Sequence, residues 1–84
     1  MRYRVRVEVF YKAGVFDPEV RTIQARLKSA GYEVDNMSKG TFFEFDVDAQ
    51  SEKEAKNLGE LLADKFFANP VVHAYRVYIV DSLE

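Results

Sequence analysis

Residues 2–11, RYRVRVEVFY, alternate strictly between two kinds of side chain. The first series is apolar and consists of Tyr3, Val5, Val7, Val9 and Tyr11. The second series is mostly charged and consists of Arg2, Arg4, Arg6, Glu8 and Phe10. Because successive side chains of a strand point to opposite faces, this pattern predicts a half-buried β-strand with a largely polar outer side.

A helix is predicted to follow, after a joint that contains two adjacent apolar residues, Val15 and Phe16. Asp17 can cap the first N–H groups of this helix, and Pro18 suits its first position. Gly31 is expected to end it in a left-handed conformation. Apolar residues recur at helical spacing in between, namely Val20, Ile23, Leu27 and Ala30.

The rest of the chain predicts a strand over 32–38, a tight turn at Lys39-Gly40 and a second alternating strand over 41–48. Ser51 and Glu54 match a capping box, which predicts the start of a second helix. Proline cannot continue a helical ladder, so Asn69-Pro70 should end that helix. Residues 71–80 are rich in β-branched and aromatic side chains and predict a last strand.

The predicted order is therefore β-α-β-β-α-β, the ferredoxin-like arrangement of the α+β class. Right-handed crossovers give a two-layer sandwich with a four-stranded antiparallel sheet and both helices on one face. The expected strand order is 4-1-3-2. Strands 1 and 3 then lie side by side, and Arg4 and Arg6 face Glu44 and Asp46.

The length of 84 residues predicts a single domain, 1–84, and 48% of the residues are hydrophobic. That is more apolar surface than one small core readily hides, which favours a homo-oligomer, either a dimer or a tetramer. The predicted oligomer face is the outer side of the sheet, which carries Phe10, Phe42, Tyr78 and Val80.

Charge and composition exclude several classes of protein. The net charge of −2 argues against binding to nucleic acid, which depends on clustered Lys and Arg. The chain has no cysteine, so a disulfide framework and a zinc–thiolate site are excluded. No apolar run approaches a membrane span, and the N-terminus lacks a signal-peptide pattern. We therefore expect a cytoplasmic protein that binds neither nucleic acid nor membrane.

No catalytic, cofactor-binding or metal site is predicted. His73 is the only histidine, and a lone histidine on a sheet usually has a structural role. Glu44, Asp46 and Asp48 could hold a hard cation, but pairing with arginine is the favoured reading. The serines lack a nearby histidine, and the glycines never cluster into a phosphate-binding loop.

Two binding modules share the predicted topology and are alternatives. RNA-recognition domains carry stacking aromatic residues on the third strand, where this chain reads KGTFFEFDV. Thr41 and Asp46 depart from that pattern, and acidic groups repel phosphate. Regulatory domains of the ACT type bind small molecules near the first strand–helix loop. In this chain the loop is AGVFDPEV, where Val15 and Phe16 either bind a partner or plug the end of the sheet.

Two motifs resemble the PurS family, the small subunit of phosphoribosylformylglycinamidine synthase. The first is KAGVFDPEVRTIQARLKSAGYEV, and the second is FANPVVHAYRV near the end of the second helix. In the predicted topology both motifs converge at one end of the sheet. The predicted docking residues are Lys12, Gly14, Val15, Phe16, Asp17, Pro18, Asn69, Pro70 and Tyr75.

The resemblance implies a non-catalytic subunit that assembles a large, PurL-like synthetase subunit and a PurQ-like glutaminase subunit and supports ammonia transfer. ATP and glutamine would be used by those partners, and this chain would hold no cofactor. The family usually carries Arg and Lys around the central hairpin, where this chain has Ser38 and Thr41. Any contact the family makes through those two basic groups is therefore in question for this chain.

Overall fold

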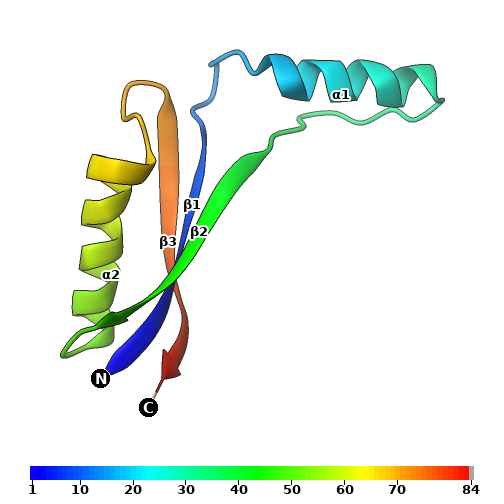
Figure 1. Cartoon of the computed structure of the whole chain (residues 1–84). Helices are drawn as coiled ribbons and strands as arrows, with labels where there is room; N and C mark the ends of the chain where they lie inside the picture. Colours follow the sequence, from blue (N-terminus) through cyan, green and yellow to red (C-terminus); the bar gives the residue numbers. More distant parts are fainter. Residues whose placement is uncertain (84) are drawn as a thin grey trace.

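The computed structural model describes residues 1–83 and contains three strands and two helices (Figure 1). The elements are β1 Arg2–Tyr11, α1 Pro18–Ser29, β2 Gly40–Asp48, α2 Glu52–Leu62 and β3 His73–Leu83. A π-helical turn, η1 Ala63–Phe67, continues α2. The two ends of the chain lie at the same end of the sheet, because Arg2 pairs with Leu83.

The sheet has the order β2-β1-β3, and both neighbours pair antiparallel with β1. Arg4 lies opposite Asp46 and Arg6 lies opposite Glu44, as the alternation predicts. The pairing with β3 shifts register between Arg4 and Val5. Strand β1 is therefore central, and the predicted adjacency of the first strand to the third and last strands is confirmed.

The core lies between one face of the sheet and α2. Val5 and Val7 are fully buried, and Tyr3 and Val9 beside them are nearly so. Helix α2 approaches the sheet closely at Gly59, where a Cβ atom would lie 2.7 Å from Cγ1 of Val77. The core is completed by Ala49, Ala55, Ala63 and Val77.

Local signals at the helix ends are confirmed. Oδ1 of Asp17 accepts hydrogen bonds from the N–H groups of Glu19 and Val20, at 3.0 and 3.4 Å. Oγ of Ser51 accepts one from the N–H group of Glu54 at 3.1 Å. Gly31 follows α1 with a φ of +95°, as expected of a left-handed residue after a helix.

The prediction of a four-stranded sheet is wrong, because residues 32–38 form no strand. The Lys39-Gly40 turn that would fold them back along β2 is also absent. A two-residue hairpin turn needs positive φ, whereas the glycines with positive φ are Gly14 and Gly31. Gly40 instead lies inside the ladder, opposite Phe10. Asn36, with a φ of +54°, further interrupts the extended run.

The prediction that both helices cover one face of the sheet is also wrong. Helix α2 lies along the sheet, whereas α1 projects beyond its end (Figure 1). Residues 30–39 return along α1, and we call residues 18–39 the arm. Tyr32 donates its N–H to the carbonyl of Leu27 at 2.9 Å, and Lys39 Nζ lies 3.3 Å from Glu19 Oε2. Of the predicted apolar stripe of α1, Val20 is buried, Ile23 and Leu27 are half-buried and Ala30 is exposed.

The last strand begins and ends later than predicted, at His73 and Leu83 rather than at 71 and 80. The π-helical turn before it was not predicted. This turn brings the ring of Phe67 onto that of Phe43, with centroids 4.4 Å apart and nearly parallel planes. Phe67 also packs against the hydrophobic core, and its ring centroid lies 5.8 Å from that of Phe45.

Replacing Gly59 by Ala should destabilise the protein. The new methyl group would lie 2.7 Å from Val77 Cγ1 and 3.0 Å from Val5 Cγ1. We expect a loss of about 1–3 kcal/mol from overpacking, which exceeds the gain of about 1 kcal/mol in helix propensity. Denaturant unfolding measures this, with Asn57→Ala on the exposed side of α2 as the control. A Gly59→Ala protein at least as stable as wild type would contradict the close helix–sheet contact.

Candidate functional site

The two sequence motifs meet at one end of the sheet, as predicted. The Nζ atom of Lys12 donates to the carbonyl oxygen of Pro70 at 2.6 Å. The backbone N–H of Lys12 donates to the carbonyl oxygen of Val72 at 3.0 Å. The ring of Tyr11 lies 5.0 Å from that of His73, at the first pair of the β1–β3 ladder. Residues 12–17 and 69–72 thus form one continuous surface, which we call the loop end.

Asn69 shapes the second half of the loop end. Its side-chain oxygen accepts from the N–H of Val71 at 3.0 Å, and its own N–H donates to Nδ1 of His73 at 2.9 Å. His73 therefore has the structural role that the sequence favours. The turn leaves Val71 78% exposed, although this residue was not among the predicted docking residues.

Phe16 is displayed rather than buried. Its side chain is 61% exposed, so it does not plug the core of this chain, whereas Val15 is half-buried. The turn that presents it uses Gly14, with a φ of +84°, and a hydrogen bond from Val15 N–H to the carbonyl of Lys12. The guanidinium carbon of Arg21 lies 5.6 Å from the centre of the Phe16 ring.

Arg21 is a site residue that the sequence reasoning missed. The one indication of this role in the sequence is that Arg21 lies in the first turns of the helix that follows the loop. The pattern of charges alone does not distinguish it from the other basic residues. Asp17 and Pro18, by contrast, act where predicted, as the cap and the first residue of α1. Their contribution to the site is to hold the direction in which the helix leaves the loop.

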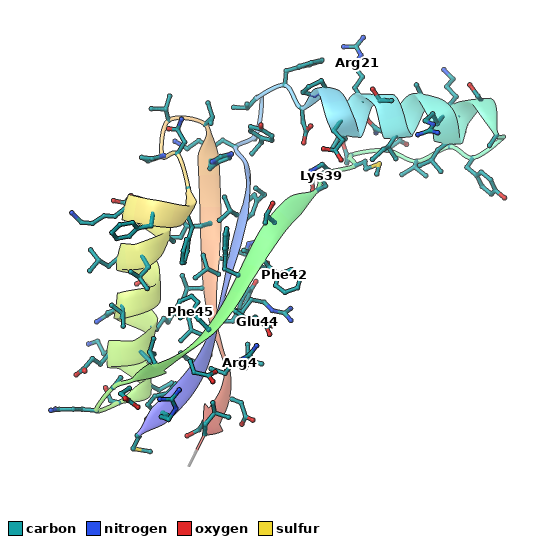
Figure 2. All side chains as sticks on the ribbon, in the orientation of Figure 1. Arg4, Arg21, Lys39, Phe42, Glu44 and Phe45 are labelled. Atoms are coloured by element: carbon teal, nitrogen blue, oxygen red, sulfur yellow. The ribbon has the colours of Figure 1, made fainter. Side chains whose placement is uncertain are left out.

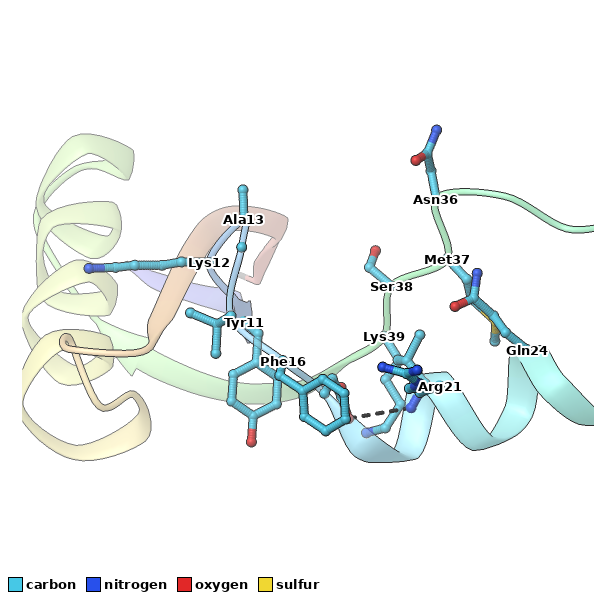
Figure 3. Close-up of a pocket in the computed structure, with 14 residues that line it drawn as sticks. Tyr11, Lys12, Ala13, Phe16, Arg21, Gln24, Asn36, Met37, Ser38 and Lys39 are labelled. Atoms are coloured by element: carbon cyan, nitrogen blue, oxygen red, sulfur yellow. Dashed lines mark hydrogen bonds between the residues drawn. The ribbon is translucent and has the colours of Figure 1, made fainter.

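A hollow of about 650 Å³ lies between the loop and the returning segment of the arm (Figure 3). Phe16 and Tyr11 stand at one side of it, and Lys39, Arg21 and Gln24 at the other. The lining carries charges of both signs, because Asp17 lies among the basic residues Lys39 and Arg21. It is the place at which an ACT-type domain would hold a ligand.

Tyr75 is not brought to the loop end surface. It lies opposite Val9 in the ladder and is half-buried against the hydrophobic core. Of the predicted docking set, the structure groups Lys12, Asp17, Asn69 and their immediate neighbours at the loop end. Whether these residues bind a partner stays a prediction.

Ion pairs cross the outer face of the sheet between β1 and β2 (Figure 2). Arg6 Nε donates to Glu44 Oε2 at 2.6 Å, and Arg4 Nε donates to Glu44 Oε1 at 3.2 Å. Arg4 also reaches Asp46 at 3.0 Å. The hydrogen bond from Arg6, more than any other contact, lowers the pKa of Glu44, and the bonds from Asp46 and then Glu44 raise the pKa of Arg4. These acidic groups are therefore paired with arginine, as favoured.

The predicted oligomer face carries exposed apolar side chains among these ion pairs. Phe42 is 59% exposed, with the Arg6 guanidinium carbon 4.7 Å from the centre of its ring. Phe10 is half-buried beneath Arg76 at 4.8 Å. Tyr78 and Val80 on β3 are also exposed. Figure 2 shows Phe42 and Glu44 on one side of β2 and Phe45 on the side of α2.

Within residues 1–83 no group of three or more acidic or histidine side chains could hold a metal ion. None of the helices in this part of the chain is both long and apolar enough to cross a membrane.

Glu44→Gln should make stability less sensitive to acid. Because the pKa of folded Glu44 is lowered, its carboxylate contributes stability above its ordinary value of 4.5, and this is lost as pH falls through the folded pKa. Wild type should thus lose melting temperature more steeply below about pH 5 than Glu44→Gln, which should be less stable at pH 7. Asp48→Asn is the control, since its side chain is 76% exposed. Parallel pH profiles for wild type and Glu44→Gln would refute the role of the ion pairs.

Comparisons with known proteins agree on one family. The family model described as "PurS: Phosphoribosylformylglycinamidine (FGAM) synthase" matches residues 4–81. The PurS subunit of Methanothermobacter thermautotrophicus is 32% identical over 79 residues, which cover 94% of each chain. That of Bacillus subtilis is 32% identical over 75 residues, or 88% of each chain.

Solved structures agree with the sequences. A chain in the structure of PurLQS from Thermotoga maritima matches with a TM-score of 0.85 and 25% identity, and the match covers 95% of this chain and 99% of that one. The resemblance of the two motifs is therefore confirmed over nearly the whole chain, and this protein belongs to the PurS family of FGAM synthase.

Proposed function

We propose that this chain is the small, non-catalytic subunit of a cytoplasmic phosphoribosylformylglycinamidine synthase in purine biosynthesis. In that role it assembles a PurL-like synthetase subunit and a PurQ-like glutaminase subunit and supports ammonia transfer between them. Family membership supports the proposal, as does the similarity to a chain in the structure of PurLQS from Thermotoga maritima. The reaction converts FGAR to FGAM with ATP and glutamine.

The observation that carries the proposal is the exposed side chain of Phe16 on an otherwise well-anchored loop. The loop is held by Lys12 and by the cap at Asp17, so its backbone needs little ordering when a partner binds. Val71 adds a second exposed apolar side chain at the loop end. A preorganised surface with apolar anchors is what a docking subunit requires.

We further propose that ATP and glutamine bind to the partner subunits rather than to this chain. The charged groups of the loop end are engaged in contacts within the chain, Lys12 with Pro70 and Asp17 with the first turn of α1. In the arm beside it, Lys39 is paired with Glu19. This chain therefore acts by contact and not by chemistry.

The protein is also proposed to be a homo-oligomer. The arm leaves α1 outside the sheet, and the outer face exposes Phe42, Tyr78 and Val80. The chain measures 51 Å in its longest dimension and 14 Å in its shortest, so much apolar surface stays uncovered in one copy.

A second candidate is a small-molecule-binding domain of the ACT type, which the hollow at the loop end favours. The two functions differ in their need for partners. An ACT-type domain would gain thermal stability from an amino acid or nucleotide added to this chain alone. The docking subunit would gain it from the synthetase and glutaminase subunits.

Phe16→Ala should lower the glutamine-dependent activity of the reconstituted complex and leave its ammonia-dependent activity less affected. Removing a central aromatic anchor typically costs about 2–4 kcal/mol of binding, so more than about tenfold of the partner affinity should be lost. The melting temperature of the isolated chain should change little, because the ring is 61% exposed. Pull-down with the two partner subunits and activity assays measure these effects.

Two further variants serve as controls. Tyr32→Ala removes a ring that is 64% exposed at the far end of α1 and should leave partner binding intact. Asp17→Ala should mainly lower stability, by about 1 kcal/mol through the lost cap. Full-strength complex formation by Phe16→Ala, or unfolding of the isolated variant, would show that the loop is not a docking element.

A further inference from the structure

A second hollow, of about 600 Å³, begins at Phe16 and runs along α1. It shares Phe16 and Arg21 with the hollow at the loop end, but no residue of the returning segment lines it. Its lining residues, all of them exposed, include Phe16, Pro18, Arg21, Thr22, Ala25 and Arg26. We call these six residues the α1 groove.

Most of the α1 groove is a surface that needs no polar partner. The ring of Phe16 stands at the loop end of the groove and is 61% exposed, and Pro18 and Ala25 add further apolar surface. The hydroxyl group of Thr22 donates to the carbonyl oxygen of Pro18 at 2.9 Å, so its hydrogen bond is already made within the helix. Contact with apolar side chains can therefore bury this part of the groove without leaving a polar group unpaired.

The charged members of the α1 groove are both arginines, and no acidic residue lines it. Neither Arg21 nor Arg26 takes part in an ion pair within residues 1–83. The guanidinium carbon of Arg21 lies 5.6 Å from the centre of the Phe16 ring, and Figure 3 shows the two side chains next to each other. An arginine held against a ring keeps its fork of N–H groups available for a carboxylate.

These properties fit an occupant that is both apolar and acidic. An apolar side chain can pack against Phe16 and Ala25 while carboxylates beside it accept hydrogen bonds from Arg21 and Arg26. A small anion would reach the arginines but would leave the apolar part of the groove uncovered. A second copy of this chain, docked symmetrically through the same groove, would bring like charges together, which is unfavourable.

We propose that the α1 groove binds an acidic, partly apolar segment of a partner subunit, and that Arg21 and Arg26 select for its carboxylates. This inference rests on the proposed docking function, whose anchor Phe16 stands at one end of the groove. It extends the docking surface from the loop end along α1 and gives the chemistry of the segment that binds there. The groove lies on a helix already ordered by the cap at Asp17, so little conformational entropy is lost on binding.

Charge reversal tests the proposal directly. The double variant Arg21→Glu with Arg26→Glu should bind the PurL-like and PurQ-like subunits together about a hundredfold more weakly than wild type, and Arg21→Ala about tenfold more weakly. Biolayer interferometry on the immobilised chain measures both affinities. The melting temperature should change little, because both arginines are exposed. Lys53→Glu with Lys56→Glu is the matched control, since it makes the same change in net charge on exposed positions of α2 and should bind like wild type.

A lysine variant separates the charge from its geometry. Arg21→Lys keeps the positive charge but loses the planar fork, so its affinity should lie between those of wild type and Arg21→Ala. Rising ionic strength should weaken binding of wild type more steeply than binding of the charge-reversed variant, because salt screens the attraction between arginine and carboxylate. Equal salt dependence of the two proteins would contradict the ion pairs.

The outcomes separate this proposal from the function on which it rests. If Phe16→Ala and the charge-reversed variant both bind at full strength, the docking function and the groove are both wrong. If Phe16→Ala binds weakly and the charge-reversed variant binds like wild type, only the groove is wrong. Two further results would also overturn the proposed occupant. A change in the sedimentation of the isolated chain on charge reversal would assign the groove to a second copy. A gain in melting temperature from free glutamate or citrate, lost in Arg21→Ala, would assign it to a small carboxylate.

Discussion

The alternation of β1 is the constraint on which the structure depends. Both other strands pair with β1, so each takes its register from it. Val5 and Val7 are fully buried on one face, while Arg4 and Arg6 pair with acidic groups on the other. A slip by one residue would place the arginines in the core and the valines in water. The registers shifted by one residue in either direction are therefore strongly disfavoured.

The small core explains why the rest of the chain is available for contact with other molecules. One helix, α2, covers the inner face and packs tightly at Gly59. Helix α1 instead lies alongside residues 30–39 in the arm, which projects beyond the end of the sheet. A chain of this shape has a high ratio of surface to volume, which suits a subunit that works by holding other proteins.

The loop end divides its residues between anchoring and display. Lys12, Asp17 and Asn69 make hydrogen bonds within the chain and fix the loops, whereas Phe16 and Val71 face solvent. The sequence predicted the convergence of the two motifs, because antiparallel neighbours place the end of one strand beside the start of the other. It did not predict the place of Tyr75 against the core or the contact of Arg21 with Phe16, since both depend on packing.

The sequence by itself determined the features whose physical causes are local. The alternation of residues 2–11 and 41–48, the caps at Asp17 and Ser51, and the family motifs all follow from side chains within a few positions of each other. Only the tertiary structure decided the number of strands. Residues 32–38 are apolar enough to suggest a strand, but a strand exists only where a neighbour accepts its hydrogen bonds. In this chain Asn36 and the ladder position of Gly40 direct the segment along α1, away from the free edge of β2.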